Sequence, residues 1–250
     1  MDDRGKEVAA KSSFTASTSP SSPIPSQLRK IGPGTPVLSR IIQLIPFAQG
    51  TYADVYGGTI QFAGEPRLDC VYKVNRPVKG PEFVRADEYD TSDHEEGGRI
   101  ARFERELKIL EELSSLQGIV VPLLLGTVRI KTISQPGLWP ALILEDVGVP
   151  IDWESRWPSG LTNSHMRKLV EGAFQKLHDA GWLHGDVAPR NVLFATRPKS
   201  CADGIPDVRI CLIDFSRAEE FDRSSARDLR RLTHEQEIID SMLDDLFLPE

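Results

Sequence analysis

Short apolar runs separated by turn residues dominate the first half of the chain. The runs at 37–45, 53–62 and 68–74 have the length and composition of β-strands, and two further runs at 119–130 and 138–147 extend the series. The polar, acidic stretch 79–98 predicts a solvated loop. A helix is predicted over 101–113 by the spacing of its apolar residues, which are Ile100, Phe103, Leu107, Leu110 and Leu113. The first half therefore predicts an antiparallel sheet accompanied by one helix.

The second half has a helical pattern. One helical face is formed by Met166, Leu169, Val170, Ala173, Phe174 and Leu177, with Thr162 or Asn163 as its cap and Gly181 as its stop. Two strand-like runs follow at 183–194 and 208–216. A final helix is predicted over about 224–247, with Leu229, Leu232, Ile239, Met242, Leu243 and Leu246 facing inward.

Composition narrows the class of protein. With 250 residues, the chain is long enough for one domain or for two small lobes that share a cleft. A net charge of -7 argues against broad binding to nucleic acid or to an anionic membrane. The three cysteines, Cys70, Cys201 and Cys211, form no disulfide or zinc pattern, and no apolar run is long enough to span a bilayer. We therefore expect an intracellular protein, with a disordered Ser/Thr/Pro-rich tail at 1–36.

The residues best suited to catalysis lie in the second half. The run His184-Gly185-Asp186-Val187-Ala188-Pro189-Arg190-Asn191 is followed by Ile213-Asp214-Phe215-Ser216. Phosphoryl transfer needs a carboxylate beside the attacking hydroxyl and oxygen ligands that hold Mg²⁺ against the phosphates. Asp186, Asn191 and Asp214 can supply both.

These two motifs resemble the catalytic loop and the metal-binding motif of the protein-kinase superfamily. The resemblance implies that Asp186 is the base, that Asn191 and Asp214 bind Mg²⁺, and that His184 is structural. Upstream, Val71-Tyr72-Lys73 resembles the strand whose lysine contacts the ATP phosphates, and Glu106 resembles the helical partner of that lysine.

The resemblance also implies a nucleotide site in the first half. The segment 47–55 is similar to the glycine-rich loop but keeps only Gly50 of its three glycines, with Ala48 and Ala53 at the other positions. Tyr52 then corresponds to the tip of this loop and Val55 to the roof over adenine. The backbone of Glu145 and Val147 corresponds to the hinge that binds the adenine edge. ATP and Mg²⁺ are thus the expected cofactors.

Several positions depart from the ordinary protein-kinase pattern. Gly185 replaces the arginine that commonly receives an activation-loop phosphate, which argues against control by that route. Ser216 replaces the glycine after Asp214-Phe215. Only residues 217–250 follow, without the segment and helices that form the peptide-docking platform. In these respects the chain resembles small atypical kinases, such as the kinase subunit of the KEOPS complex and the lipopolysaccharide sugar kinases.

Taken together, these features predict an α+β, bilobal, protein-kinase-like fold. Residues 37–147 are expected to form an antiparallel β N-lobe with one helix, and residues 148–250 a reduced, mainly helical C-lobe. The leading functional hypothesis is transfer of the ATP γ-phosphate to a Ser or Thr hydroxyl of a protein, with a partner that presents the substrate. The alternatives are a kinase for a sugar or another small molecule and a pseudokinase that binds nucleotide without chemistry.

Overall fold

The computed structural model describes residues 45–49, 53–61, 67–75, 96–130, 139–151, 161–197 and 207–247. The predicted tail at 1–36, most of the first predicted strand, most of the acidic stretch 79–98 and Cys201 lie outside these residues. Cys70 and Cys211 are both buried with free thiols, as expected for small core residues.

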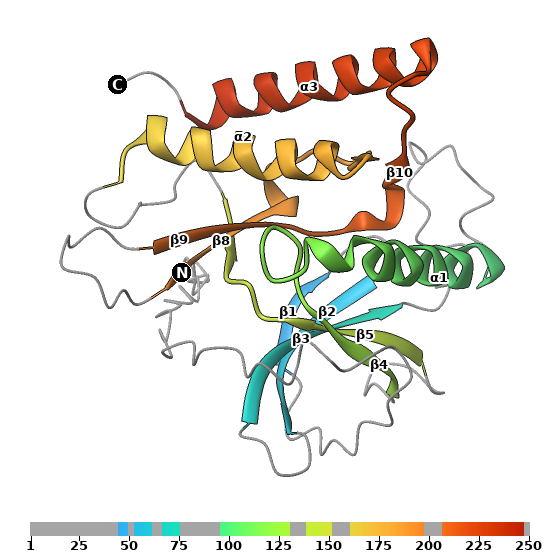
Figure 1. The fold of residues 1–250 in the computed structure, drawn as a ribbon. Coiled ribbons are helices and arrows are strands. Elements are labelled where there is room, and N and C mark those ends of the chain that lie inside the picture. The colour runs from blue at the N-terminus through green and yellow to red at the C-terminus, as the bar shows by residue number, and fades with distance from the viewer. Residues whose placement is uncertain are drawn as a thin grey trace, which may run out of the picture.

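A five-stranded antiparallel sheet forms the first half of the chain, with the strand order β1-β2-β3-β5-β4 (Figure 1). Its strands are β1 (Ile45–Gln49), β2 (Ala53–Gln61), β3 (Arg67–Asn75), β4 (Leu124–Ile130) and β5 (Trp139–Glu145). Burial along the central strand β3 alternates, and Cys70, Tyr72 and Val74 all point into the core. Among the described residues, the first strand spans Ile45–Gln49 and pairs with β2, and the rest of the predicted run, 37–44, lies outside them.

The helix of the first half, α1 (Glu96–Glu112), continues into a short 3-10 turn, η4 (Leu113–Ser115). Leu110 and Leu113 are buried, and Phe103 and Leu107 pack at the edge of the core, as the spacing predicts. The helix starts earlier than predicted and takes in the last three residues of the acidic stretch. Ile100 shares the helical spacing of these residues but is 41% exposed, because contact with the core begins only at Phe103.

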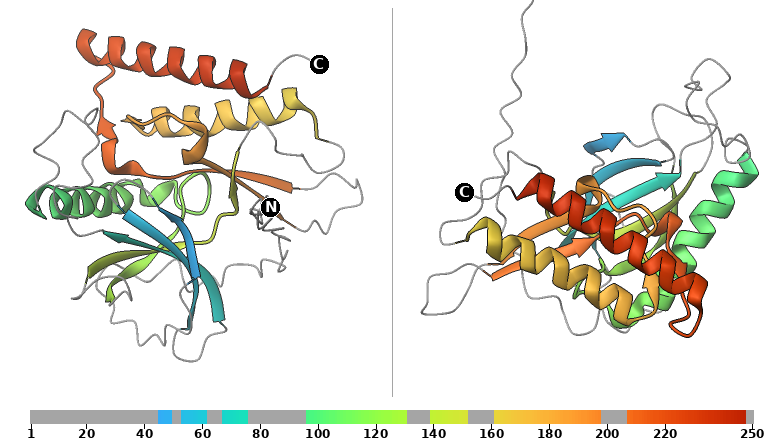
Figure 2. Two further views of the ribbon diagram at one scale, coloured as in Figure 1. Left: turned by 180° about the vertical axis from the view of Figure 1, so that it is seen from behind. Right: turned by 90° about the horizontal axis from the view of Figure 1, so that it is seen from above.

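The second half contains two long helices over a small sheet. The sheet has the order β6-β8-β9, built from β6 (Val149–Pro150), β8 (Val192–Arg197) and β9 (Asp207–Leu212). A two-stranded pair joins β7 (Trp182–Leu183) to β10 (Glu219–Glu220), and single 3-10 turns lie at η5 (Pro189–Asn191) and η6 (Phe215–Arg217). The helices α2 (Asn163–Asp179) and α3 (Ala226–Leu246) lie side by side on the side of this sheet that faces away from β1–β5 (Figures 1 and 2).

Both long helices begin at a side-chain cap. Thr162 accepts a hydrogen bond from the backbone N–H of His165 at 3.2 Å, which decides between the two predicted caps, and Ser225 accepts one from Asp228 at 3.3 Å. The predicted inward face of α3 is correct for Ile239, Met242 and Leu243, but Leu229 is 43% exposed. The first turns of α3 extend past the end of α2 (Figure 1), and Leu229 is not among the described residues that pack against the main apolar cluster.

One apolar cluster joins the two halves. It takes in residues from α1, α2, β8, β9 and α3, whereas a second cluster lies within the five-stranded sheet. The predicted α+β, bilobal fold is therefore confirmed, and its lobes share a core beside β9.

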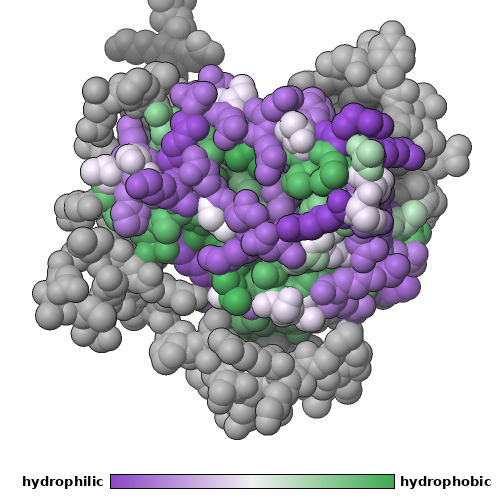
Figure 3. Space-filling view, turned by 45° about the horizontal axis from the view of Figure 1, so that its top comes forward, coloured by the Kyte–Doolittle hydropathy of each residue, from purple (hydrophilic) through white to green (hydrophobic). Residues whose placement is uncertain are grey.

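The surface over α2 and α3 is mainly hydrophilic. Apolar side chains show there as separate patches rather than as one continuous surface (Figure 3). Within the described ranges, no helix combines the length and apolar character needed to cross a membrane.

We expect Phe174→Ala to lower the free energy of unfolding by about 3–5 kcal/mol, because the ring is 2% exposed and its removal leaves a cavity. Urea denaturation followed by circular dichroism measures this value. The matched control is Leu229→Ala at the exposed start of α3, which we expect to change stability by less than about 0.5 kcal/mol. Equal losses in the two variants would contradict the core assignment.

Candidate active site

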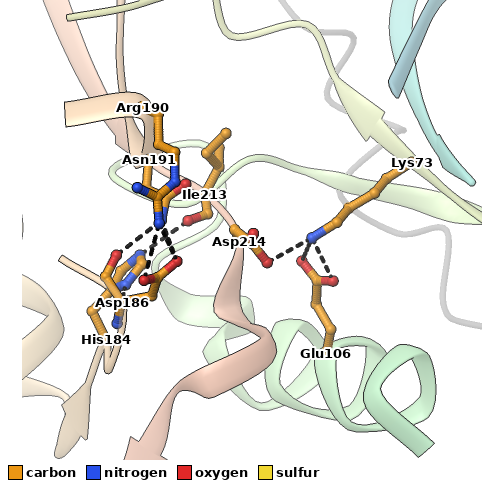
Figure 4. A network of polar contacts seen from close by, with 8 residues as sticks. All are labelled: Lys73, Glu106, His184, Asp186, Arg190, Asn191, Ile213 and Asp214. Atoms are coloured by element: carbon orange, nitrogen blue, oxygen red, sulfur yellow. Dashed lines mark hydrogen bonds and ion pairs between the residues drawn. The ribbon is translucent and has the colours of Figure 1, made fainter. Parts of the chain in front are cut away.

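Lys73 lies at the centre of a three-residue charge cluster (Figure 4). Its Nζ donates to both carboxylate oxygens of Glu106, at 2.8 and 2.7 Å, and to Oδ1 of Asp214 at 2.8 Å. Lys73 comes from β3, Glu106 from α1, and Asp214 from the end of β9. The expected ion pair between the lysine and the helical glutamate is thus present, and it brings together three elements that are far apart in sequence.

The protonation of this cluster follows from its burial and its charges. Burial on its own would lower the pKa of Lys73, but the two carboxylates raise it above the ordinary lysine value, so the ammonium is retained. Burial would likewise raise the pKa of Asp214, yet Lys73 and the Ser216 side chain lower it to about 2. Because two carboxylates share one ammonium, the cluster keeps an excess of negative charge that favours a further cation.

The backbone at Asp214 has an unusual conformation. Its φ angle is +63°, in the left-handed region that non-glycine residues rarely adopt, and it is the one described non-glycine residue with a positive φ. Two consecutive residues of α1 hold the segment that follows: Glu106 accepts the backbone N–H of Phe215, and Arg105 donates to the carbonyl of Ala218 at 3.0 Å. The strained conformation is therefore fixed from the side of α1.

Asp186 and Asn191 form a second polar group close to Asp214 (Figure 4). The Asn191 amide nitrogen donates to the Asp186 carbonyl at 2.8 Å and to its Oδ2 at 2.9 Å. Arg190 donates to both carboxylate oxygens of Asp186, at 3.1 and 3.0 Å, from a largely exposed position. The Asp186 carboxylate is therefore held in one orientation, and Oδ1 of Asn191 is the side-chain atom left to bind a ligand.

His184 is buried, and both of its ring nitrogens are engaged. Nδ1 accepts the backbone N–H of Asp186 at 3.3 Å, so Nε2 carries the proton and donates to the carbonyl of Ile213 at 3.0 Å. Burial lowers the pKa of His184, which keeps the ring neutral. The ring thus connects the loop 184–191 to the segment after β9 that carries Asp214, as expected for a structural residue.

Glu235 on α3 supports the same loop and was not found by the sequence analysis. It is 6% exposed and accepts the backbone N–H groups of His184 and Gly185, at 2.9 and 2.8 Å. Its Oε1 also contacts Nε2 of His178 at 2.9 Å, and these donors lower its pKa although burial alone would raise it. The sequence does contain one sign of this role. Glu235 lies four residues before Ile239, which places its carboxylate on the inward face of an amphipathic helix.

Gly185 occupies a position that accepts no other residue without rearrangement. Its φ angle is +73°, and a Cβ atom there would lie 2.3 Å from the carbonyl oxygen of Arg217. The glycine that replaces the usual kinase arginine is therefore required by close contact between the catalytic loop and the segment after Asp214.

The predicted nucleotide-binding residues are only partly described. Gly50 and Tyr52 lie outside the described residues. Val55 lies on β2 directly opposite Lys73. At the end of β5, the Glu145 N–H donates to the carbonyl of Leu123 at 3.0 Å, so only its carbonyl is left to bind a base. Val147 is buried and packs with Leu193 and Cys211.

We expect Gly185→Ala to destabilise the protein by about 2 kcal/mol or more, because alanine must adopt a left-handed conformation against a backbone carbonyl. Urea denaturation measures the change. Gly172→Ala is the control, since it lies within α2 with open space around it and should gain about 0.5–1 kcal/mol. Tolerance of alanine at both sites would contradict the contact with Arg217.

We expect Lys73→Met to raise the pKa of Asp214 from about 2 to above its ordinary value of 3.8, because burial remains while the ammonium is gone. Carboxyl-carbon NMR titration, with Asp214→Asn for assignment, measures the shift. In the wild type, the lowered pKa contributes stability that is present above about pH 4 and is lost as the pH falls towards 2. The stability difference between wild type and variant should therefore narrow in that range. A pKa that stays near 2 in the variant would contradict the pairing.

Comparison with solved structures identifies the type of fold. The chain matches the Rio2 kinase of Chaetomium thermophilum, solved as an ADP/Mg²⁺-phosphoaspartate complex, with a TM-score of 0.56 and 14% sequence identity. The match covers 83% of this chain and 57% of that chain, so this chain spans little more than half the length of that kinase. At this identity the likeness concerns the fold, which is protein-kinase-like. A search of curated proteins gave no match.

The family comparison covers more than half of the chain. The matching model is that of the lipopolysaccharide kinase (Kdo/WaaP) family, and the match runs over residues 98–245. This range includes α1 with Glu106, the catalytic loop, the end of β9 with Asp214, and nearly all of α3. The chain therefore belongs to the lipopolysaccharide kinase (Kdo/WaaP) family, within the protein-kinase-like superfamily.

Proposed function

We propose that the chain is an ATP-dependent phosphotransferase that acts on a hydroxyl acceptor. The observation that carries this proposal is the arrangement of Lys73 between Glu106 and Asp214, with Asp186 and Asn191 beside it (Figure 4). Buried or half-buried charges from four separate segments meet here, and stability alone gives little reason to gather them, because buried ion pairs recover their desolvation cost poorly. Family membership supports the same reaction class.

In this proposal Asp186 is the general base. Its carboxylate is 22% exposed, so an acceptor hydroxyl can reach it, while Asn191 and Arg190 hold its orientation. Asp186 accepts the proton of the acceptor hydroxyl as the oxygen attacks the γ-phosphorus, and the bond from this phosphorus to the β–γ bridging oxygen breaks, so that ADP leaves. Arg190 then lies beside the negative charge of the phosphate group that the acceptor has received.

Lys73 is the proposed ligand of the α and β phosphates. In the described structure its Nζ bonds Asp214, and nucleotide phosphates would take over that contact while Glu106 keeps the ammonium in place. Gly50, Tyr52 and Val55 would cover the nucleotide. The carbonyl of Glu145 and the backbone of Val147 would bind the adenine edge.

The proposed Mg²⁺ ligands are Asn191 and Asp214. Their donor set fits a hard cation, because Asp214 stays ionised and Oδ1 of Asn191 is left free when its amide nitrogen bonds Asp186. When bound, Mg²⁺ neutralises charge on the phosphates. Across the described ranges, no group of three or more His, Cys, Asp and Glu side chains could hold a metal alone. Phosphate oxygens would complete the coordination.

We consider two classes of acceptor. The first is the Ser or Thr hydroxyl of a protein, presented by a partner. The second is a sugar hydroxyl, which the match to a lipopolysaccharide kinase family favours. The short connection from Asp214 to the start of α3, residues 215–225, also leaves little chain for binding an extended peptide.

We expect Asp186→Ala to lower kcat by about 10² to 10⁴, the range typical of a positioned base, with little change in stability. Transfer of ³²P from γ-labelled ATP in the presence of Mg²⁺ measures it, with one protein acceptor and one acidic sugar acceptor assayed in parallel. The control is Asp240→Ala, an exposed carboxylate on α3, which should retain wild-type activity.

The pattern of incorporation separates the candidates. Label in protein that is lost in Asp186→Ala supports a protein kinase, and label in the sugar supports a sugar kinase. Full activity in Asp186→Ala would remove the proposed base. Binding of Mg²⁺-ATP without transfer to either acceptor would instead favour a pseudokinase.

A further inference from the structure

Arg209 on β9 makes a buried contact with the hinge, defined here as residues 145–148 between β5 and β6. Its Nη1 donates to Oε1 of Glu145 at 2.6 Å, and the two side chains are only 9% and 13% exposed. Nε donates to the carbonyl of Ile119 at 3.2 Å, and Nη2 donates to the carbonyl of Val121 at 3.1 Å and contacts Sγ of Cys211 at 3.6 Å. One guanidinium therefore joins β9 to the hinge and to the connection that precedes β4.

The contact fixes the backbone of the hinge as well as its side chain. The second carboxylate oxygen of Glu145 accepts the N–H of Leu123 at 3.1 Å, while the Glu145 N–H donates to the Leu123 carbonyl at 3.0 Å. Glu145 is thus bound to Leu123 twice and to Arg209 once. With the N–H and both carboxylate oxygens occupied, the position of the Glu145 peptide is set by this network.

The same strand leads to the charge cluster. β9 ends at Leu212, two residues before Asp214, and the backbone N–H of Leu212 donates to the carbonyl of Val120 at 2.8 Å. Arg209 therefore holds the hinge in register with the strand that carries Asp214. A rigid strand tied at one end to the hinge and at the other to the charge cluster fixes the separation of these two regions.

We propose that Arg209 is a positioning residue that acts through Glu145 to set the preference for adenine over guanine. The inference rests on the proposed function, in which the Glu145 carbonyl binds the base. A fixed carbonyl accepts a hydrogen bond from the 6-amino group of adenine but faces the 6-oxo group of guanine, which is also an acceptor. If the carbonyl can move away, the penalty against guanine falls.

The test separates positioning from simple stabilisation by comparing Arg209→Met with the double variant Arg209→Met/Glu145→Met. The single variant leaves a buried carboxylate without its cation, so we expect a lower Tm and weaker ATP binding. The double variant replaces the pair by two apolar side chains, which often restores stability. We expect the Tm to recover while the ratio of GTP Kd to ATP Kd stays at least about fivefold below that of the wild type.

The readout is isothermal titration calorimetry with ATP and with GTP in the presence of Mg²⁺. Binding is measured without turnover, so the result does not depend on whether phosphate is transferred. A wild-type protein that transfers no phosphate but prefers ATP would contradict the proposed reaction, and the role of Arg209 could still be tested. The control is Arg167→Met, which removes the exposed contacts of Arg167 with Glu171 and Asp244 and should leave the ratio unchanged. A double variant with wild-type Tm and wild-type nucleotide preference would overturn the proposal, as would a wild type that binds both nucleotides equally.

Discussion

The active-site region depends on a single ammonium group. Lys73 bonds Glu106 and Asp214 at the same time, so β3, α1 and the end of β9 meet at one atom. Without this cation, the Glu106 carboxylate, which is only 6% exposed, would lose its partner, and breaking a buried pair of this kind typically costs about 3–5 kcal/mol. The placement of α1 against the sheet and against the segment after Asp214 is therefore an electrostatic requirement as well as a packing result.

Two buried glutamates, on two different helices, organise the two loops of the site in the same way. Glu106 on α1 accepts the backbone N–H of Phe215, and Glu235 on α3 accepts those of His184 and Gly185. Main-chain donors in irregular segments need partners when they are buried, and a helix offers a rigid support for the acceptor. The loops can therefore be short and irregular without losing their shape.

The sequence predicted the parts of this structure that repeat and missed those that depend on tertiary contact. The two-residue alternation at Cys70, Tyr72 and Val74 and the apolar face of α2 follow from local periodicity. Periodicity alone predicts that Leu229 faces inward, but it cannot show which turns of a helix have a neighbour to pack against, and Leu229 is 43% exposed. Glu235 and Arg209 are charged residues whose partners lie about 50 or more positions away, and a single sequence does not show which partners such residues have. The kinase-like order of residues, by contrast, located Lys73, Glu106 and Asp214 through family resemblance.

The segment from Asp214 to α3 is held in place by side chains and backbone groups of the same chain. Glu219 contacts Arg105 of α1 and Arg231 of α3, so a carboxylate bridges two helices. These side chains are one-third to one-half exposed, and exposed ion pairs are individually weak and screened by salt. The stronger restraints are main-chain contacts, namely the bond from Arg105 to the Ala218 carbonyl and the pairing of β10 with β7. Gly185 also fits against the Arg217 carbonyl, so close backbone packing adds a further restraint on this segment.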